Sequence, residues 1–589
     1  MNKNSIFKSL RNCIYNSIKL LYDFDSKYLF ILLVVNVIQG VLPVLLIRIM
    51  QKVINLLQIG TDDFRNIVIL IIIYVLISIS SLIIQATFSY YKCKFSLKFS
   101  KYINLKILEH VVNFKLEYFE NSEVYNVISR AQSQDGSNIL IYINEVLGIL
   151  KQVITILCSI FVLTDYQWWI LGTIIFISFI RCMVTIEIDK EWHELRRART
   201  YDERKAWYIN FLFLGGKAFK ELKIFDLSKY LINKYSNILD KINAQDYGMQ
   251  KKSTKGTLVI DIIDSLSVGL IYAYTIYMGF SNIILIGDVT AYIECISKIK
   301  SSAQSIFSCI PGMVEQSLYI NYLFEFFEIP IILNEKGISV DRIQKIELEN
   351  VIYKSNNGRL ILDDINLNLE VNKKIAIVGE NGSGKTTLVK LLAGLYDNYE
   401  GTIRVNGIDF KSVNKKSYYE KLSSVFQDYV RFEMSIRENV AFGNIMKINE
   451  DKYIYDRIKT VNLDKSIQGP DGLDVIIGNW FGKRELSGGE WQRIGIARAI
   501  MRNPEIIIFD EPDAALDVIQ QNELIKLYNM ISQDKIAIYV THRIQNVQKF
   551  AEQIVVLSKG KIIEIGTHDE LIEKKGMYFN MYCCDEVSN

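Results

Sequence analysis

Apolar residues in the first half of the chain form long, nearly unbroken runs. These runs cover 28–47, 67–87, 139–163, 168–188, 257–280 and 283–306. Each is close to the roughly 20 residues that an α-helix needs to cross a bilayer. In the second run, isoleucine and leucine occupy every face of a helix, which excludes an amphipathic soluble helix. The pattern predicts an all-α transmembrane region of about six spans, in which neighbouring helices cover the carbonyl freed by Pro43.

The polar links between the runs are asymmetric in length and charge. The links near 58–65, 164–167 and 281–282 are short and carry little positive charge, whereas 92–115 and 189–255 are long and rich in Lys and Arg. Because basic loops stay in the cytoplasm, we expect both termini to be cytoplasmic.

Both long links also show helical spacing of apolar residues, over 95–109 and 202–225. We expect the membrane helices to continue into the cytoplasm and to turn through short helices at 116–130 and 214–221. Tyr118 and Phe119, in an otherwise polar stretch, predict an aromatic contact with whatever lies below.

Four ionisable residues inside the runs, Arg181, Asp261, Asp264 and Glu294, need a separate explanation. Such residues face a bundle interior or a wet cavity. Alternatively, Glu294 pairs with Lys298 on its own helix, and the two aspartates lie near cytoplasmic water. The pattern leaves both interpretations open.

The pattern changes near residue 330, where short β-branched runs begin to alternate with helical ones. This alternation is typical of an α/β layer. We therefore expect four segments: a cytoplasmic N-terminal segment at 1–27, a transmembrane domain at 28–325, a linker at 326–345 and an α/β domain at 346–589.

One stretch of the α/β region has the pattern of a phosphate-binding loop, G-x-x-x-x-G-K-[ST]. It follows the apolar run 374–378 and precedes a helical run at 388–392, which is the expected strand-loop-helix context. Glycines let successive backbone N–H groups face a polyphosphate, while Lys385 reaches the β- and γ-phosphates and the Thr386 hydroxyl holds Mg²⁺. The loop consists of Gly379, Glu380, Asn381, Gly382, Ser383, Gly384, Lys385, Thr386 and Thr387.

Two further apolar runs end in polar residues suited to phosphate chemistry. Asp510 and Glu511 follow four strand residues, and His542 follows the run 536–541. At the C-terminal edge of a parallel sheet, Asp510 can reach Mg²⁺ through water and Glu511 can orient the attacking water or take its proton. We expect His542 to point at the γ-phosphate.

A second anion site is predicted about a hundred residues after the loop. Ser487 is the expected N-cap of a helix that begins with Gly488 and Gly489, whose N–H groups are free to bind an anion. The phosphate loop already supplies the one anion site that the phosphates of a bound nucleotide need. We therefore expect the second site to close over a nucleotide that is held by another subunit.

The composition of the chain argues against several classes of protein. The chain has 589 residues, is 50% hydrophobic and carries a net charge of +3, which gives no basic signature for nucleic acid. Its eight cysteines form no C-x-x-C pair and it has four histidines, so neither a disulfide framework nor a zinc site is expected. We expect no cleavable signal peptide.

With these motifs in order, the chain resembles ATP-binding cassette half-transporters of the exporter type. The resemblance covers nearly all of it and implies a cassette-type P-loop ATPase domain, ATP and Mg²⁺ as cofactors, and Thr386, Gln427 and Asp510 at the metal. It also implies a head-to-tail homodimer in which Ser487–Gly489 of one copy cover ATP on the other. The motifs are Gly379–Thr387, Gln427, Leu486–Glu490, Ile506–Glu511, Ala514–Asp517 and His542.

Three positions depart from the family pattern. Ser355 stands where an adenine-stacking aromatic is usual, so we expect Tyr353 to stack instead. Glu490 replaces a commoner glutamine, which adds negative charge near phosphate. Asp513 stands where Ser or Thr is common. None of these changes removes a catalytic group.

The cargo is a weaker inference. The segments 119–125, 220–225 and 489–493 are similar to bacterial exporters of lantibiotics and other modified peptides. The segment before the first span holds Cys13 and no histidine, so we expect no leader peptidase activity of the kind that some such exporters carry. We therefore expect peptide export from the cytoplasmic membrane of a bacterium. Multidrug or lipid export, uptake of a metal chelate, and an ATP-gated sensor of the same architecture remain alternatives.

Overall fold

The protein is described from a computed structural model that covers residues 3–60, 64–132, 136–163, 168–216, 218–331, 337–355, 357–463, 472–478, 481, 484–512 and 518–587. The chain divides into two compact units. The helical unit comprises Met1–Glu109 and Val127–Ile329, and the sheet unit comprises His110–Asn126 and Pro330–Asn589.

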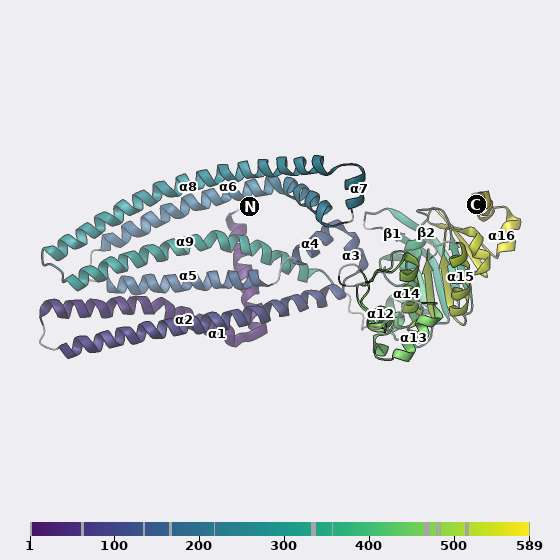
Figure 1. The fold of residues 1–589 in the computed structure, drawn as a ribbon, viewed down its shortest axis with the longest axis horizontal. Helices are drawn as coiled ribbons and strands as arrows, with labels where there is room; N and C mark the ends of the chain where they lie inside the picture. Colours follow the sequence, from purple (N-terminus) through teal and green to yellow (C-terminus); the bar gives the residue numbers. More distant parts are fainter. Residues whose placement is uncertain are drawn as a thin grey trace. The chain divides into compact units, whose positions relative to one another are not determined.

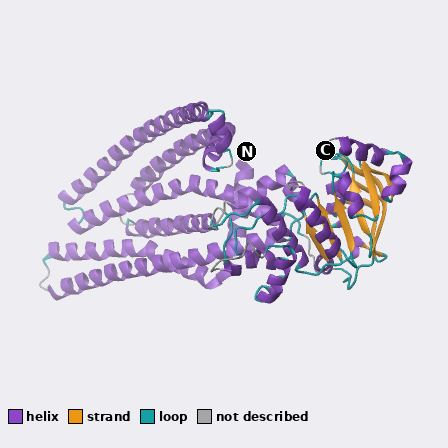
Figure 2. Ribbon diagram, turned by 45° about the vertical axis from the view of Figure 1, so that its right-hand side comes forward, coloured by secondary structure: helices purple, strands orange, loops and turns teal. Residues whose placement is uncertain are grey.

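Long helices make up nearly all of the described helical unit, and in Figures 1 and 2 α6 and α8 lie side by side. Helix α5 packs between α1 and α9, while α6 and α8 form a second packed pair. The helices are α1 (Lys3–Ile59), α2 (Phe64–Val112), α5 (Ser137–Val162), α6 (Trp168–Leu214), α7 (Phe219–Ile224), α8 (Ser228–Phe280) and α9 (Ile286–Glu328), and α4 (Ser122–Gln132) crosses the division between the units.

The apolar runs fall within these helices as expected. Four of the described helices, α1, α2, α5 and α8, are long and apolar enough to cross a membrane. The two remaining predicted spans lie in α6 and α9, which have 47 and 43 residues. The two short links at 164–167 and in 61–63 fall partly or wholly outside the described residues.

Helix α1 contains a sharp bend at Asp25, where φ is −159° and ψ is 96°. The Asp25 carboxylate accepts hydrogen bonds from the backbone N–H groups of Lys27 and Tyr28, at 3.0 and 3.3 Å. This is the geometry of an N-cap, which satisfies the first free N–H groups of a new helix. The first predicted span therefore begins as a separately capped helix.

Helix α6 ends earlier than the spacing of its apolar residues predicts. The expected helical pattern over 202–225 is interrupted after Leu214, and a new helix, α7, begins at Phe219. Gly216 has φ of +70°, a left-handed conformation that ends helices, and the Gly215 N–H donates to the Phe211 carbonyl at 2.8 Å. The stop lies within 214–221, where the sequence predicts a turn through a short helix, although the apolar spacing over 202–225 does not show it because glycine carries no hydrophobic signal.

Ionisable residues of the helical unit pair between helices. Arg181 of α6 contacts Asp261 of α8 at 2.7 Å, and Lys300 of α9 contacts Asp264 of α8 at 2.8 Å. The Gln304 amide also donates to Asp264, at 3.2 Å. The contacts of the buried Asp264 favour the interpretation in which this residue faces the bundle interior, whereas the side chain of Asp261 is 50% exposed.

The sheet unit contains two sheets, with strand orders β2-β1-β4-β5 and β10-β9-β3-β8-β7-β6. In the second sheet, β9, β3, β8, β7 and β6 are mutually parallel where they pair, and β10 is antiparallel to β9. The strands are β1 (Lys345–Lys354), β2 (Leu360–Glu370), β3 (Lys374–Val378), β4 (Tyr399–Val405), β5 (Ile408–Asp409), β6 (Leu422–Val425), β7 (Ile506–Asp510), β8 (Ile536–Val540), β9 (Gln553–Ser558) and β10 (Lys561–Gly566).

Helices cover the second sheet, so its central strands are buried on both sides. Every residue of β7 and β8 is buried, as the continuous apolar runs predict for parallel strands. The helices of this unit are α3 (Leu116–Glu120), α10 (Lys385–Leu392), α11 (Lys415–Lys421), α12 (Ile436–Ala441), α13 (Asp451–Thr460), α14 (Gly488–Ile500), α15 (Val518–Ile531), α16 (His568–Lys574) and α17 (Met577–Val587).

The short helix α3 packs against the sheet unit through an acidic rather than an aromatic contact. Leu116 packs on the core between the sheets, and the Glu120 carboxylate accepts hydrogen bonds from Lys390 and the Tyr396 hydroxyl, both at 2.8 Å. Phe119, by contrast, is 41% exposed. The expected aromatic contact of Tyr118 and Phe119 stays a prediction; both rings lie near the ring of Phe114 in the same segment, with centroids 5.8 and 6.3 Å away.

Candidate functional site

The predicted phosphate loop connects β3 to α10 and has the backbone that such a loop requires. Gly384 caps α10 with φ of +105°, a conformation that favours glycine. A side chain at Gly379 would lie 2.1 Å from the Leu557 carbonyl oxygen, so only glycine fits there. Gly382 has open space around it. The loop therefore leaves its outer face free for a ligand.

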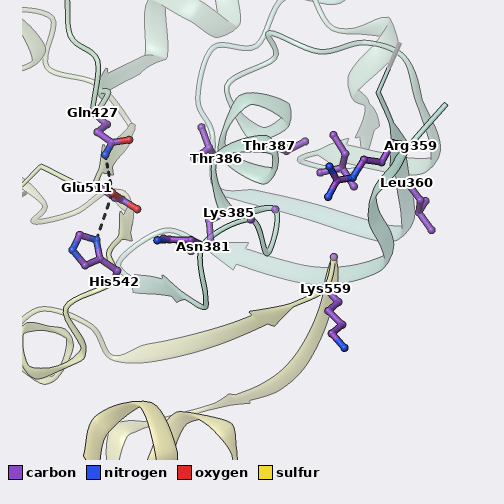
Figure 3. A pocket seen from close by; sticks show the side chains of 14 residues that line it. Arg359, Leu360, Asn381, Lys385, Thr386, Thr387, Gln427, Glu511, His542 and Lys559 are labelled. Atoms are coloured by element: carbon purple, nitrogen blue, oxygen red, sulfur yellow. Dashed lines mark hydrogen bonds and ion pairs between the residues drawn. The ribbon is translucent and has the colours of Figure 1, made fainter. Parts of the chain in front are cut away.

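This loop forms one wall of a cavity of about 800 Å³, drawn in Figure 3. The opposite sides come from the turn between β1 and β2, the turn between β9 and β10, and the C-terminal ends of strands in the second sheet. The lining residues are Arg359, Leu360, Ile361, Asn381, Gly382, Gly384, Lys385, Thr386, Thr387, Gln427, Glu511, His542, Lys559 and Gly560.

Lys385 lies at the base of the cavity and is 5% exposed. Its ammonium group donates to the carbonyls of Gly379 and Glu380, at 2.8 and 3.0 Å. Burial lowers the pKa of Lys385, while the carboxylates of Glu511 and Asp510 oppose that shift. A bound phosphate would supply the negative charge that this buried ammonium lacks.

Glu511 stands at the centre of a polar group formed by three strand ends. Its Oε2 accepts a hydrogen bond from the Gln427 amide at 2.9 Å and lies 3.5 Å from His542 Nδ1 (Figure 3). These residues follow β6, β7 and β8, which are neighbours in the sheet, so their C-terminal ends meet at one edge. Glu511 has φ of +44°, which turns the chain sharply as it leaves β7.

Asp510, at the end of β7, is 2% exposed. Burial, and after it the negative charge of the neighbouring Glu511 carboxylate, raise the pKa of Asp510 to about 6. Its Oδ1 has no hydrogen-bond partner among the described residues. A buried, unsatisfied carboxylate oxygen fits a water-bridged divalent cation, which would favour the charged form. The described residues contain no cluster of three or more His, Cys, Asp or Glu that could hold a metal by itself.

The second predicted anion site opens α14. Ser487 is its N-cap: its hydroxyl accepts from the Glu490 N–H at 3.3 Å, and the Glu490 carboxylate accepts from the Ser487 N–H and hydroxyl, both at 2.9 Å. The Tyr429 hydroxyl donates to the Gly488 carbonyl at 3.2 Å. Ser487, Gly488 and Gly489 do not line the cavity beside the phosphate loop.

Tyr353 corrects an expectation. It is 4% exposed and stacks on Tyr396 with ring centroids 4.8 Å apart, so it has no free face for adenine. Its place in β1 is a core position, paired with Leu362 and Tyr399, and the alternation of a strand turns the ring inward. The motif Ala514–Asp517 and the neighbouring Asp513 lie outside the described residues.

Sequence reasoning missed three exposed lining residues, Arg359, Leu360 and Lys559. They lie on two turns some 200 residues apart, and no local motif marks them. They reach the same cavity because β2 of the first sheet packs beside the β9–β10 turn of the second: the Asp363 N–H donates to the Gly560 carbonyl at 2.8 Å.

Comparison with known proteins agrees with this geometry. Residues 362–514 match the ABC transporter family and residues 27–299 match the ABC transporter transmembrane region. The chain is 32% identical over 577 residues to the subtilin transport ATP-binding protein SpaT of Bacillus subtilis, covering 97% of this chain and 93% of that protein. It is 28% identical to the nisin transport ATP-binding protein NisT of Lactococcus lactis, covering 98% and 96%.

A solved structure supports the fold independently. A bacterial Atm1-family ABC exporter with ATP bound matches with a TM-score of 0.76 at 20% identity, covering 98% of each chain. The phosphate loop, the strand-end carboxylates and the apolar helices thus occur in the setting that the sequence motifs indicate. The chain belongs to the ATP-binding cassette (ABC) transporter family, as an exporter whose ATPase domain drives transport across a membrane.

Proposed function

We propose that two copies of this chain form a homodimer that hydrolyses ATP to export a modified peptide across the bacterial cytoplasmic membrane. The observation that carries the cargo assignment is the similarity, over nearly the whole length of both chains, to transporters named for subtilin and nisin. In this proposal the chain consists of a transmembrane domain at 28–325, a linker at 326–345 and a nucleotide-binding domain at 346–589.

The loop and three side chains at the cavity have proposed roles in ATP hydrolysis. Lys385 binds the β- and γ-phosphates, and the backbone N–H groups of the loop hold the remaining oxygens. Glu511 orients the attacking water or takes its proton, because its carboxylate is already held by Gln427 and lies next to His542. His542 contacts the γ-phosphate from the same edge.

Thr386, Gln427 and Asp510 would hold Mg²⁺, with Asp510 acting through water. The unsatisfied Oδ1 of Asp510 supports this assignment. When bound, the ion neutralises charge that develops on the phosphate oxygens. The protein directs the Thr386 hydroxyl at the cavity, and a bound cation would favour the charged form of the buried Asp510 carboxylate, whose pKa is raised.

The separation of the two anion sites supports the proposed homodimer. Ser487 to Gly489 lie outside the lining of the cavity that holds Lys385, so in our proposal they close over ATP bound by the partner copy. All motif residues are present in one chain, so two identical chains are sufficient to complete two sites.

Lipid export is the second candidate. The chain is 25% identical over 82% of its length to an ATP-dependent lipid A-core flippase of Wigglesworthia glossinidia brevipalpis. It is also 25% identical over 96% of its length to a putative multidrug export protein of Bacillus subtilis. Peptide export remains the proposal because the peptide transporters match with higher identity.

Inside-out membrane vesicles test the proposal. ATP added outside should drive accumulation of a labelled lantibiotic precursor peptide, and vesicles carrying Glu511→Gln should show none. Accumulation of a labelled lipid or dye, but no peptide, would transfer the assignment to the second candidate. Conductance or signalling without accumulation of any compound would contradict export.

A further inference from the structure

The end of the cavity away from the phosphate loop is formed by cationic and aliphatic side chains. Arg359 and Leu360 come from the β1–β2 turn, and Lys559 comes from the β9–β10 turn. None of the lining residues that the structure describes carries an aromatic ring next to these turns. The base of a nucleotide whose phosphates lie on Lys385 must extend toward one of these turns.

Two backbone hydrogen bonds join the described residues of the turn that carries Arg359. The Ser355 N–H donates to the Arg359 carbonyl at 2.9 Å, and the Gly358 N–H donates to the Ser355 carbonyl at 2.8 Å. Gly358 has φ of +75°, which permits the tight reversal. These bonds fix the Arg359 backbone, and in Figure 3 its guanidinium points into the cavity.

The aromatic residues of this strand pair are committed elsewhere. The Tyr353 ring is stacked on Tyr396, whose hydroxyl is hydrogen-bonded to Glu120 at 2.8 Å. Turning the Tyr353 ring outward would break this stack and leave a hole in the core between the two sheets. An exposed aromatic ring is therefore not available at the base end of the cavity from β1.

We infer that the planar guanidinium of Arg359 is the surface on which the nucleotide base stacks. Guanidinium groups stack on aromatic rings and gain from cation–π attraction, and the turn fixes the backbone from which this side chain extends. Leu360, which is 47% exposed, supplies apolar contact beside it. This inference rests on the proposed nucleotide site and adds a statement about which bases that site accepts.

The chemistry of this surface predicts weak discrimination between purines. Stacking reads the face of a base rather than its hydrogen-bonding edge. Arg359 and Lys559 carry only donors. Guanine offers two acceptors, O6 and N7, whereas adenine offers N7 beside a donor amino group. These donors can pair with O6 and N7 of guanine and with N7 of adenine, so GTP should serve as a substrate at least as well as ATP, with kcat/KM values within about threefold of each other because stacking carries most of the contact.

The test uses the full-length protein in lipid nanodiscs and measures KM for ATP and GTP together with binding of inorganic tripolyphosphate. Arg359→Ala should raise both KM values roughly three- to tenfold and leave tripolyphosphate affinity unchanged. Arg359→Lys keeps the charge but loses the plane, so it should behave like Arg359→Ala. Arg359→Tyr replaces the guanidinium with another planar group, so its KM for ATP should stay close to that of the wild type.

Arg404→Ala is the matched control, because Arg404 is an arginine of the same sheet that pairs with Glu349 at 2.7 Å and does not line the cavity. Unchanged KM values in Arg359→Ala, or a parallel loss of tripolyphosphate affinity that Arg359→Lys restores, would overturn the inference in favour of no role or a phosphate contact. Either result would leave ATP hydrolysis by the wild type intact, whereas an inactive wild type would contradict the proposed function itself.

Discussion

The two units of this protein differ in how their apolar residues are used. In the sheet unit, β3, β7 and β8 are buried at nearly every position, and the chemistry sits where those strands end. In the helical unit, α2 has 49 residues but few buried ones, among them Ile67 and Phe95. The sheet unit thus completes its own core, whereas the helical unit leaves apolar surface for lipid or a second copy.

This difference explains why the sequence is informative about one unit and not about the other. A catalytic carboxylate must stand at one place, so its motif is specific. A membrane helix needs only length and apolarity, which many sequences provide. Roles in ATP hydrolysis can therefore be proposed for single residues, while the cargo rests on similarity to other transporters.

The comparison is tested most strongly at Glu511. Glu511→Gln keeps the size of the side chain but cannot take a proton, so ATP turnover should fall by at least about 100-fold while ATP binding persists. Measurement of phosphate release and of labelled ATP binding separates the two effects. Glu552→Gln, an exposed carboxylate outside the cavity, should behave as wild type, and near-normal turnover in Glu511→Gln would contradict its role.

The thermal stability of the helical unit should depend more on its buried interhelical ion pairs than on its exposed ones. The Asp264 side chain is 9% exposed and that of Asp261 is 50% exposed. Asp264→Asn leaves Lys300 without its carboxylate partner and should lower the melting temperature by roughly 5 °C. Asp261→Asn should change it by no more than about 1–2 °C. Equal shifts in the two variants would show that burial of these pairs does not set their effect.

Helix α3 offers a test of how ATP-driven closure of the sheet unit is coupled to transport by the membrane helices. Lys390 lies on α10, which begins at Lys385, and contacts Glu120 at 2.8 Å. Glu120→Gln should reduce transport roughly fivefold while leaving basal ATPase near normal, because the coupling contact is weakened and the cavity is untouched. A double-mutant cycle with Lys390→Met checks the pair, and additive losses would mean that the two residues act separately.

The smallest effect is expected at Glu490. Its carboxylate holds the hydroxyl and N–H of Ser487, the groups proposed to meet the partner's γ-phosphate. Glu490→Gln removes the negative charge but keeps an acceptor for the Ser487 hydrogen bonds. The KM for ATP should fall about two- to fivefold, more at low salt than at high salt. An increased KM would show that the charge assists nucleotide binding.

Much of the fold and site was predictable because local chemistry dictated it. The phosphate loop, the strand before Asp510 and the cap at Ser487 each depend on neighbouring residues. The contact of Glu511 with Gln427 and His542 depends instead on β6, β7 and β8 being adjacent, which no local pattern states. Tyr353 was misassigned because strand alternation shows that a face exists but not which face is the core.

The account depends above all on a nucleotide site shared between two chains. Ser487→Arg in one copy and Lys385→Ala in the other, purified as the mixed dimer, place both lesions in one composite site and leave the second site whole. Both changes in one copy, paired with a wild-type copy, damage each site once. We predict that the first dimer hydrolyses ATP faster than the second. Equal ATPase rates in the two dimers would contradict the shared site.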